Sequence, residues 1–354
     1  MSESTPSLPG LDLPAVLRWL AANTADVIDQ TATARLIAGG RSNLTYLLDD
    51  GHRQVVLRRP PLGHVLATAH DMGREYRIIS ALARTAVPVP AALGLCTDTA
   101  VNGAPFYAMS FVDGLVVRAD TVVTAGLTTS DRHGLAASMM AVLADLHEVD
   151  VEAVGLSDFG RPAGFMGRQL SRWSKQLDAS RSRELTDIDR LRDELGARVP
   201  DSSGGGIVHG DYRLDNLLVA PPSAADALSV RAVLDWEMAT LGDPLADLGL
   251  LLAYWDVLSA MDSPVVQNVG VAQGFPAGAT LADWYRDRRG GDLDLTELPW
   301  YEAFGLFKLA VILEGIHYRH QLGQTVGDDF ANIGAGVPAL VSAGLEVLAS
   351  GKLG

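Results

Sequence analysis

The chain has 354 residues, of which 48% are hydrophobic and 20% are charged. This composition is typical of a globular protein, but the length exceeds what one hydrophobic core usually serves, so we expect two lobes. A formal net charge of −15 argues against nucleic acid or an anionic membrane as the main partner, because both would repel the protein.

Cysteine content and apolar patterning bear on the cellular compartment. The single cysteine, Cys96, excludes an intrachain disulfide framework and fits a reducing environment. Residues 1–10 lack the basic and apolar segments of a secretory signal. The longest apolar stretch, residues 248–255, is far shorter than the ~20 residues that cross a bilayer. We therefore expect a soluble, cytoplasmic protein without membrane insertion, whose oligomeric state the sequence leaves open.

Strand patterns dominate the first third of the chain. Five runs favour β-structure, and an Asp-Gly pair between the second and the third run favours a hairpin turn. The five predicted strands are 34–38, 44–48, 54–58, 92–96 and 106–112. Helical spacing of apolar residues predicts a short helix over 14–23 and a longer one over 71–84.

Helical patterns dominate the rest of the chain, which contains a flexible, glycine-rich connector at residues 201–206. We therefore predict an α+β protein with an N-lobe of residues 1–112 and a C-lobe of residues 113–354. The predicted helices of the C-lobe span 131–147, 165–177, 186–198, 244–258, 281–288, 299–322 and 328–350.

The most informative stretch runs from Ile207 to Val219. An apolar run enters a polar turn, His209-Gly210-Asp211, with Asn216 five positions after the aspartate, and a second apolar run leaves it. A further short strand over 231–234 delivers Asp235 at its end. The pattern predicts a catalytic loop between two strands, where three oxygen-bearing side chains converge. Such convergence suits a divalent cation and a phosphate.

These residue types match phosphoryl transfer from ATP. A hydroxyl that attacks the γ-phosphoryl group needs a carboxylate to accept its proton, and Mg²⁺ needs oxygen ligands. We predict that Asp211 is the base and that Asn216 and Asp235 bind the metal. The sequence contains no G-x-x-x-x-G-K-[ST], G-x-G-x-x-G, G-x-S-x-G or H-E-x-x-H motif, which removes several other enzyme classes.

The loop of residues 208–216, together with Asp235-Trp236-Glu237, resembles the protein-kinase-like superfamily. Within it, the sequence is most similar to the aminoglycoside phosphotransferase family, which includes choline-kinase-like and acyl-CoA-dehydrogenase-associated members. The resemblance covers residues 34 to 260. It implies a two-lobed fold with a small antiparallel-sheet N-lobe and a larger, mainly helical C-lobe, and it implies ATP and Mg²⁺ as cofactors.

The resemblance also implies roles for residues on the nucleotide side. Residues 39–43 are similar to the nucleotide flap, while Arg58 stands at the strand position of the phosphate-binding lysine and Glu75 at the helix position that pairs with it. The backbone from Ser110 to Val112 would read adenine, and Asp247 resembles the buried aspartate that braces the catalytic loop. The predicted nucleotide-binding residues are Gly40, Ser42, Asn43, Arg58, Glu75, Ser110 and Val112.

Three of these roles stay open at the level of sequence. No lysine precedes Lys175, so an arginine must take the phosphate-binding position, and Arg59 competes with Arg58 for it. Arg213 either stabilises charge on the γ-phosphate as a catalytic residue or makes a contact within its own loop. Glu237 either adds to the metal site or bonds to nearby backbone.

We thus expect an ATP- and Mg²⁺-dependent kinase that phosphorylates a hydroxyl group of a small molecule. The alternative is a catalytically weak pseudokinase or scaffold module. The sequence leaves two candidates for the acceptor. An aminoglycoside would bind to carboxylates, whereas a hydroxyacyl compound or other small alcohol would bind in an apolar pocket. The sequence also leaves open whether the enzyme prefers ATP or GTP. Candidate carboxylates are Asp256, Asp262, Asp283, Asp287, Asp292 and Asp294. Candidate aromatic residues are Trp255, Phe275, Trp284, Trp300, Tyr301 and Phe304.

Overall fold

The computed structural model describes residues 8–25, 27–38, 43–62, 71–201, 204–221, 228–261, 269–324, 330 and 332–354. The chain divides into two compact units. The first unit comprises Met1–Asp113 and Ala232–Glu237, and the second comprises Gly114–Arg231 and Met238–Gly354. The segment Ala232–Glu237, which follows the predicted catalytic loop, therefore belongs to the N-terminal unit. The predicted boundary between residues 112 and 113 divides the chain at one point and does not include this return.

The first unit is built on a five-stranded antiparallel sheet with the strand order β1-β2-β3-β5-β4. Its strands are β1 (Thr33–Ala38), β2 (Leu44–Asp49), β3 (Gln54–Arg59), β4 (Ala92–Cys96) and β5 (Phe106–Ser110). The five strands match the predicted runs, with one notable difference. The fifth was predicted to extend to Val112, but β5 ends at Ser110 because Ser110 already pairs with Val55 near the start of β3.

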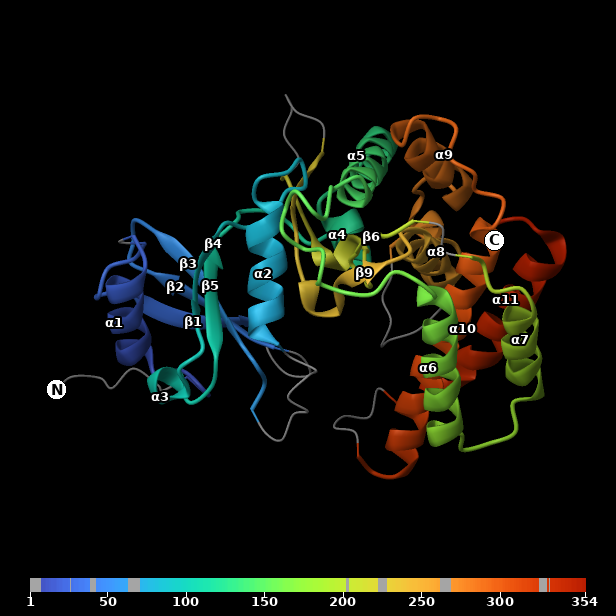
Figure 1. The fold of residues 1–354 in the computed structure, drawn as a ribbon, viewed down its shortest axis with the longest axis horizontal. Helices are drawn as coiled ribbons and strands as arrows, with labels where there is room; N and C mark the ends of the chain where they lie inside the picture. Colours follow the sequence, from blue (N-terminus) through green and yellow to red (C-terminus); the bar gives the residue numbers. More distant parts are fainter. Residues whose placement is uncertain are drawn as a thin grey trace. The chain divides into compact units, whose positions relative to one another are not determined.

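Helices cover both faces of this sheet (Figure 1). Helix α1 (Leu13–Asn23) shares an apolar core with alternate residues of the strands, including Val55 and Leu57 of β3. Helix α2 (Met72–Leu82) packs on the other face, against β4 and β5. Because side chains alternate along a strand, Arg58 points to the α2 face and Arg59 to the α1 face.

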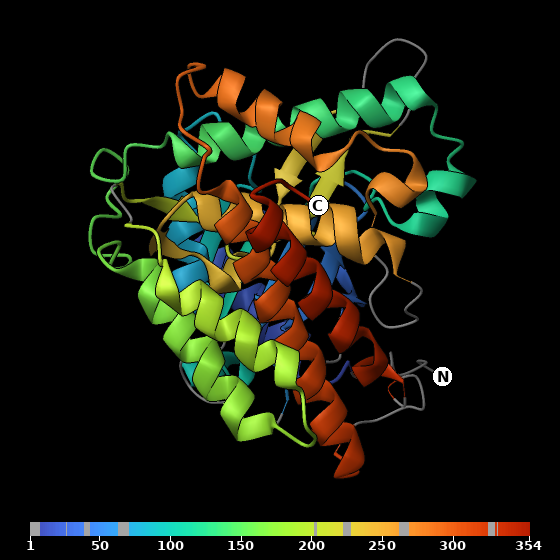
Figure 2. The ribbon, with the colours of Figure 1, turned by 90° about the vertical axis from the view of Figure 1, so that its right-hand side faces the viewer.

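The second unit is mainly helical and centres on α10 (Leu298–Gln321), which packs against α6, α7, α8 and α11. Figure 2 shows α10 and α11 lying side by side. Helix α5 packs against α9. The other helices are α4 (Ala119–Thr124), α5 (Thr129–His147), α6 (Phe165–Ser180), α7 (Thr186–Ala197), α8 (Leu245–Leu252), α9 (Gly278–Arg288) and α11 (Val337–Ser350).

Helices α8 and α10 approach each other closely at Gly249. A Cβ atom at this position would lie 2.4 Å from the backbone carbon of Tyr301, so only glycine permits the contact. This approach fixes α8, which carries Asp247, against the central helix of the unit.

Short strands frame the predicted catalytic loop. Strand β6 (Gly206–Val208) pairs with β9 (Thr240–Gly242), and the 3₁₀ turn Leu214–Asn216 leads into β7 (Leu217–Val219). Strand β7 pairs with β8 (Val230–Val233), which leads to Asp235. The strand-loop-strand arrangement predicted around Asp211 is therefore present.

Several elements differ from the sequence prediction. Helices α3 (Thr99–Asn102) and α4 were not expected, because each is too short for a helical period to show. The helix predicted to reach residue 258 ends at Leu252 and continues as a π-helical segment, Ala253–Val257. The helix predicted over 328–350 begins at Val337 after a 3₁₀ turn, Ile333–Gly336, while residues 325–329 and 331 lie outside the described residues.

One described stretch, Ile333–Ser350, is long and apolar enough to cross a membrane by length and composition alone. Its helical part, α11, packs against α7 and α10 within the second unit. This packing is what a core helix of a globular unit would show.

Candidate active site

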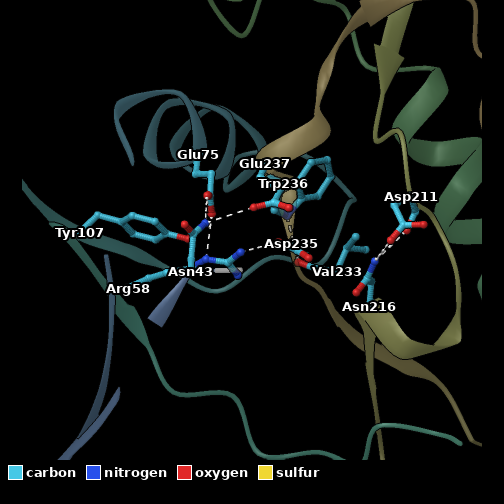
Figure 3. Close-up of polar contacts among 10 residues, drawn as sticks. All are labelled: Asn43, Arg58, Glu75, Tyr107, Asp211, Asn216, Val233, Asp235, Trp236 and Glu237. Atoms are coloured by element: carbon cyan, nitrogen blue, oxygen red, sulfur yellow. Dashed lines mark hydrogen bonds and ion pairs between the residues drawn. The ribbon is translucent and has the colours of Figure 1, made fainter. Parts of the chain in front are cut away.

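In the first unit, Arg58 lies between two carboxylates (Figure 3). Its Nε atom is 3.1 Å from Oε2 of Glu75 on α2, and its Nη2 atom donates a hydrogen bond to Oδ1 of Asp235, which follows β8. Burial alone would lower the pKa of Arg58, but the two carboxylates outweigh it and raise that pKa. The guanidinium is therefore a permanent cation that joins the sheet, α2 and the segment after β8.

Glu75 is the centre of a buried polar group, as Figure 3 shows. Tyr107 of β5 donates from its hydroxyl to Oε2 of Glu75 at 3.0 Å, and Nδ2 of Asn43 donates to Oε1 at 2.7 Å. The same Asn43 nitrogen lies 3.3 Å from Oε2 of Glu237. Burial raises the pKa of Glu75, and the charge of Arg58 opposes that shift. Asn43, the last residue of the predicted flap, is thus tied to the helix that positions Arg58.

The alternation of β3 separates Arg58 from its competitor. Arg59 points to the opposite face of the sheet, where its Nη1 atom donates to the backbone oxygens of Gly10 and, at 3.1 Å, Asn102. Arg58 is the arginine that contacts the predicted partner Glu75 and the predicted metal ligand Asp235. The geometry therefore favours Arg58 for the phosphate-binding position, a role that stays a prediction.

Asp235 has a backbone φ of 65° and is the one non-glycine residue with positive φ in the described part of the chain. Such a conformation costs free energy in an L-residue and is concentrated at functional sites. The following Trp236 is buried, and its indole nitrogen donates to Val233 O at 3.0 Å. The tryptophan thus anchors the turn that carries Asp235.

In the second unit, Asp211 and Asn216 contact each other directly (Figure 3). Nδ2 of Asn216 donates to Oδ2 of Asp211 at 2.9 Å and to its backbone oxygen at 2.8 Å. The 3₁₀ turn Leu214–Asn216 closes the loop so that residues five positions apart meet. The amide of Asn216 orients the carboxylate that we predict to be the base.

Asp247 of α8 fixes the backbone of the predicted catalytic loop, as the family resemblance implied. Its carboxylate accepts hydrogen bonds from the backbone amides of His209 at 2.6 Å and Gly210 at 2.7 Å. Gly210 has a φ of 87°, and a Cβ atom there would lie 3.0 Å from the backbone oxygen of Met238. Burial would raise the pKa of Asp247, but its hydrogen bonds, led by that of His147, lower it. A charged, buried aspartate therefore fixes the backbone next to Asp211.

His147 continues this network on the side away from the loop. Its Nε2 atom lies 3.3 Å from Oδ2 of Asp247, and its Nδ1 atom lies 2.7 Å from the hydroxyl of Tyr285. Burial lowers the pKa of His147, so a neutral ring donates from Nε2 to the carboxylate and accepts from the tyrosine. The brace of the loop therefore extends to α5 and α9.

Arg213 makes its contacts within its own loop and to Tyr254. Its Nη1 atom is 2.8 Å from Oδ2 of Asp215 and its Nε atom is 3.4 Å from Oδ2 of Asp211, while the guanidinium lies 5.0 Å from the centre of the Tyr254 ring. Burial alone would lower the pKa of Arg213, but these carboxylates outweigh burial and raise that pKa. The geometry thus supplies the loop-contact role, and action on phosphate stays a prediction.

Tyr254 was not singled out in the sequence. Its hydroxyl donates a hydrogen bond to the side chain of Asp211, and its pKa is raised by burial and by that carboxylate. It lies in the π-helical segment Ala253–Val257, and such segments occur frequently at functional sites. Periodicity could not reveal it, because the apolar run from Leu248 predicts a continuous α-helix.

The remaining predicted residues fall into two groups. Gly40 and Ser42 lie outside the described residues. The amide of Ser110 donates to Ala91 O at 2.9 Å and that of Phe111 to Gln54 O at 3.4 Å. Of the hinge residues predicted to read adenine, Val112 is therefore the one whose amide should be tested first.

The predicted metal ligands fit Mg²⁺ chemically. Asn216 uses its amide nitrogen on Asp211, which leaves its oxygen for a ligand, and Asp235 uses one of two carboxylate oxygens on Arg58. Within the described ranges, no group of three or more His, Cys, Asp or Glu side chains could hold a metal. Mg²⁺ commonly binds through one or two carboxylates and takes its other ligands from phosphates and water. The donor set suits such a shared ion.

Of the two sets of residues suggested for the acceptor, Asp294 and Tyr301 line a pocket of about 690 Å³ in the second unit. Of the carboxylates, Asp256 accepts from Gly278 N at 3.0 Å, Asp283 pairs with Arg286 at 2.7 Å, and Asp294 accepts from Thr296. Asp262 lies outside the described residues. Five of the six aromatic residues are buried core: Trp255, Phe275, Trp300, Tyr301 and Phe304.

Comparison with known proteins agrees with this arrangement. A family model described as "Phosphotransferase enzyme family" matches residues 33–284. Mouse acyl-CoA dehydrogenase family member 10 is 36% identical over 293 residues, which cover 80% of this chain and 26% of that protein. The chain spans between 26% and 40% of the length of the curated relatives it matches.

Solved structures show the same fold. A candidate aminoglycoside phosphotransferase from Ralstonia eutropha is 31% identical, with a TM-score of 0.81 and coverage of 96% of this chain and 98% of that one. An aminoglycoside phosphotransferase in a ternary complex with streptomycin and ATP is 16% identical, with a TM-score of 0.55 and coverage of 91% and 99%, and it supports the fold alone. The predicted two-lobed, protein-kinase-like α+β fold is thus confirmed, and the chain belongs to the phosphotransferase enzyme family.

Proposed function

We propose that this protein transfers the γ-phosphoryl group of ATP to a hydroxyl group of a small molecule, with Mg²⁺ required. The observation that carries the proposal is the Asp211 carboxylate, oriented by Asn216 on a loop whose amides bond to Asp247. Family membership supports the reaction class. The Arg58–Glu75–Asp235 group supports the nucleotide side.

The acceptor hydroxyl loses its proton to Asp211 as its oxygen bonds to the γ-phosphorus. The bond from that phosphorus to the bridging oxygen of ADP breaks, and ADP carries the electron pair away. Catalysis of this step rests on positioning and charge stabilisation, so no covalent enzyme intermediate is needed. Tyr254 and Asn216 both contact the Asp211 carboxylate and hold it in one orientation.

The nucleotide contacts come from the first unit. Arg58 presents a fixed cation to the phosphates, held by Glu75 and Asp235. Asn216 and Asp235 would hold Mg²⁺, which supplies neutralisation of charge on the phosphate oxygens. The proposal requires both Asp211 and Asp235 for turnover.

A second candidate is a nucleotide-binding module without turnover. The observation in its favour is the hydrogen bond from Arg58 to Asp235, which occupies one oxygen of the predicted metal ligand. In a turnover-competent enzyme, that carboxylate must still bind the metal through its other oxygen.

The test is Mg²⁺-dependent ADP formation with a panel of hydroxylated small molecules. Wild-type protein should turn over at least one acceptor, and Asp211→Asn should lower kcat by about 10³-fold while ATP binding persists. Asp193→Asn, at an exposed carboxylate of α7, is the matched control and should behave as wild type. ATP binding without turnover of any acceptor would favour the second candidate, and unchanged turnover in Asp211→Asn would refute the mechanism.

A further inference from the structure

The distribution of lysine marks one face of the second unit. The chain has lysine only at Lys175, Lys308 and Lys352. Two of the three lie on α6 and α10, which pack against each other. The ammonium of Lys308 donates to Gly210 O at 3.1 Å, in the residue before Asp211. A scarce cation is therefore placed directly beside the predicted catalytic base.

Lys308 has no carboxylate within ion-pair distance among the described residues. Burial lowers the pKa of Lys308, and the charges of Asp211 and Asp247 oppose that shift. An ammonium carries three hydrogen-bond donors, and Gly210 O accepts one of them. A partly desolvated ammonium with spare donors can accept an anionic group at small further desolvation cost.

Trp173 of α6 links Lys308 to further cations. The Lys308 nitrogen lies 5.5 Å from the centre of a Trp173 ring, and the Arg172 guanidinium carbon lies 5.8 Å from it. Both distances fall in the cation–π range, in which the ring stabilises positive charge without neutralising it. Cationic side chains therefore continue from Lys308 to α6.

Three cations form one face of α6, at helical spacings of four and three. They are Arg168, Arg172 and Lys175, and they border a shallow hollow of about 820 Å³. None of the three pairs with a carboxylate of the described residues, although the neighbouring helix α7 pairs its Arg190 and Arg192. We call Arg168, Arg172, Lys175 and Lys308 the cationic face. It is conspicuous in a protein with a net charge of −15.

We propose that the cationic face binds a carboxylate or phosphate group of the acceptor, so that the phosphorylated molecule is a hydroxylated anion. This inference rests on the proposed phosphoryl transfer. Opposite charge on the substrate would be attracted to the loop, whereas a polycation such as an aminoglycoside would be repelled from it. Of the carboxylates that could hold such a cation, Asp256, Asp283 and Asp294 are engaged with local partners.

The first test compares acceptors that differ in charge: glycerate, glycerol 3-phosphate, glycerol, choline and streptomycin. Anionic members should be preferred, and the carboxylate and phosphate arms show which anion fits. In Arg172→Gln/Lys175→Gln, KM for the anion should rise at least 10-fold while kcat changes less than 3-fold. The control Arg190→Gln/Arg286→Gln removes two exposed charges of the second unit and should leave both parameters unchanged. Preference for a neutral or cationic acceptor would overturn the proposal.

A second test needs no turnover. The fluorescence of Trp173 is obtained by subtracting the signal of the Trp173→Phe variant from that of the wild type. Its quenching by iodide and by caesium reports the electrostatic potential near the ring. Iodide should quench at least 3-fold more strongly than caesium in wild type, and the Arg172→Gln/Lys175→Gln variant should lose this preference. Equal quenching by the two ions would reject the cationic face as an anion site. Asp211-dependent turnover of a cationic acceptor would reject this inference and keep the proposed function, whereas turnover that survives Asp211→Asn would reject the function itself.

Discussion

Two buried sites, one in each unit, treat charge differently. In the first unit, Arg58 and Glu75 are buried together, and Asp235 and Tyr107 complete their contacts. In the second unit, Lys308 and Glu302 of α10 have no oppositely charged partner among the described residues. Glu302 accepts from the backbone nitrogen of Gly354 at 3.2 Å, and Lys308 donates to Gly210 O.

This difference separates two uses of charge. A buried ion pair leaves a charged group in a fixed position, whatever its net contribution to stability. An unpaired buried charge either neutralises through a shifted pKa or serves a ligand that brings the opposite charge. We infer that Arg58 is preorganised for a nucleotide, that Glu302 is neutralised by burial, and that Lys308 serves a ligand.

The largest expected effect comes from replacing, one at a time, the two adjacent arginines that lie on opposite faces of β3. Arg58→Ala should reduce kcat/KM for ATP by about 10²–10³-fold, because it removes a preorganised cation and leaves Glu75 and Asp235 unpaired. Arg59→Ala should destabilise the fold while nucleotide kinetics stay within 3-fold of wild type. Steady-state kinetics and thermal unfolding of both variants measure this contrast. If both variants lost kcat/KM for ATP equally, Arg58 could not be assigned the phosphate-binding role.

A somewhat smaller effect is expected at the brace of the loop. Asp247→Asn keeps one acceptor oxygen but replaces the charged acceptor of the His209 and Gly210 amides. We expect kcat to fall by about 10–100-fold, with ATP affinity retained, because the nucleotide contacts lie in the first unit. Calorimetry with ATP and initial-rate kinetics separate the two quantities. A loss confined to ATP affinity would contradict this division of roles.

Tyr254→Phe sharpens the comparison within the second unit, because it removes one hydroxyl from Asp211 and keeps the ring under Arg213. We expect a loss of about 1 kcal/mol of transition-state stabilisation, or ~5–10-fold in kcat, because one hydrogen bond to a carboxylate disappears. Tyr318→Phe on α10 is the matched control. Wild-type kcat in Tyr254→Phe would remove this tyrosine from the site.

The smallest effect on activity is expected at Glu302, where stability should change instead. Burial raises the pKa of this carboxyl from 4.5 to about 7, so the folded state binds more protons than the unfolded chain between these values. Stability should therefore fall as pH rises from 4.5 to about 7 and then level off. Glu302→Gln should remove this slope, which corresponds to a stability difference on the order of 2–3 kcal/mol between pH 5 and pH 8. Denaturant unfolding at pH 5 and pH 8 measures it, and an unchanged slope would place the titration elsewhere.

Much of the fold was predictable because its elements carry local signals. The strands alternate or end at turn residues, and the loop from His209 to Asn216 brings base and amide together over five residues. The choice between Arg58 and Arg59 was not predictable. Both faces of β3 are covered by helices, so residues of both faces are buried and the pattern is the same for either arginine.

Other parts of the site depend on contacts that sequence spacing does not encode. Tyr254 reaches Asp211 from a π-helical segment inside a run that reads as a regular helix. Lys308 and Trp173 meet from helices far apart in the chain. Only the folded structure reveals that Lys308, one of the scarce lysines, lies beside the loop.

The most direct test of the account is transfer of the γ-phosphoryl group itself, followed by ³¹P NMR with Mg²⁺-ATP and the best acceptor. We expect a phosphate ester with wild-type protein, and its near-complete loss in both Asp211→Asn and Asp235→Asn, one variant in each unit. A phosphate ester formed at the wild-type rate by either variant would contradict the claim that both carboxylates serve this reaction.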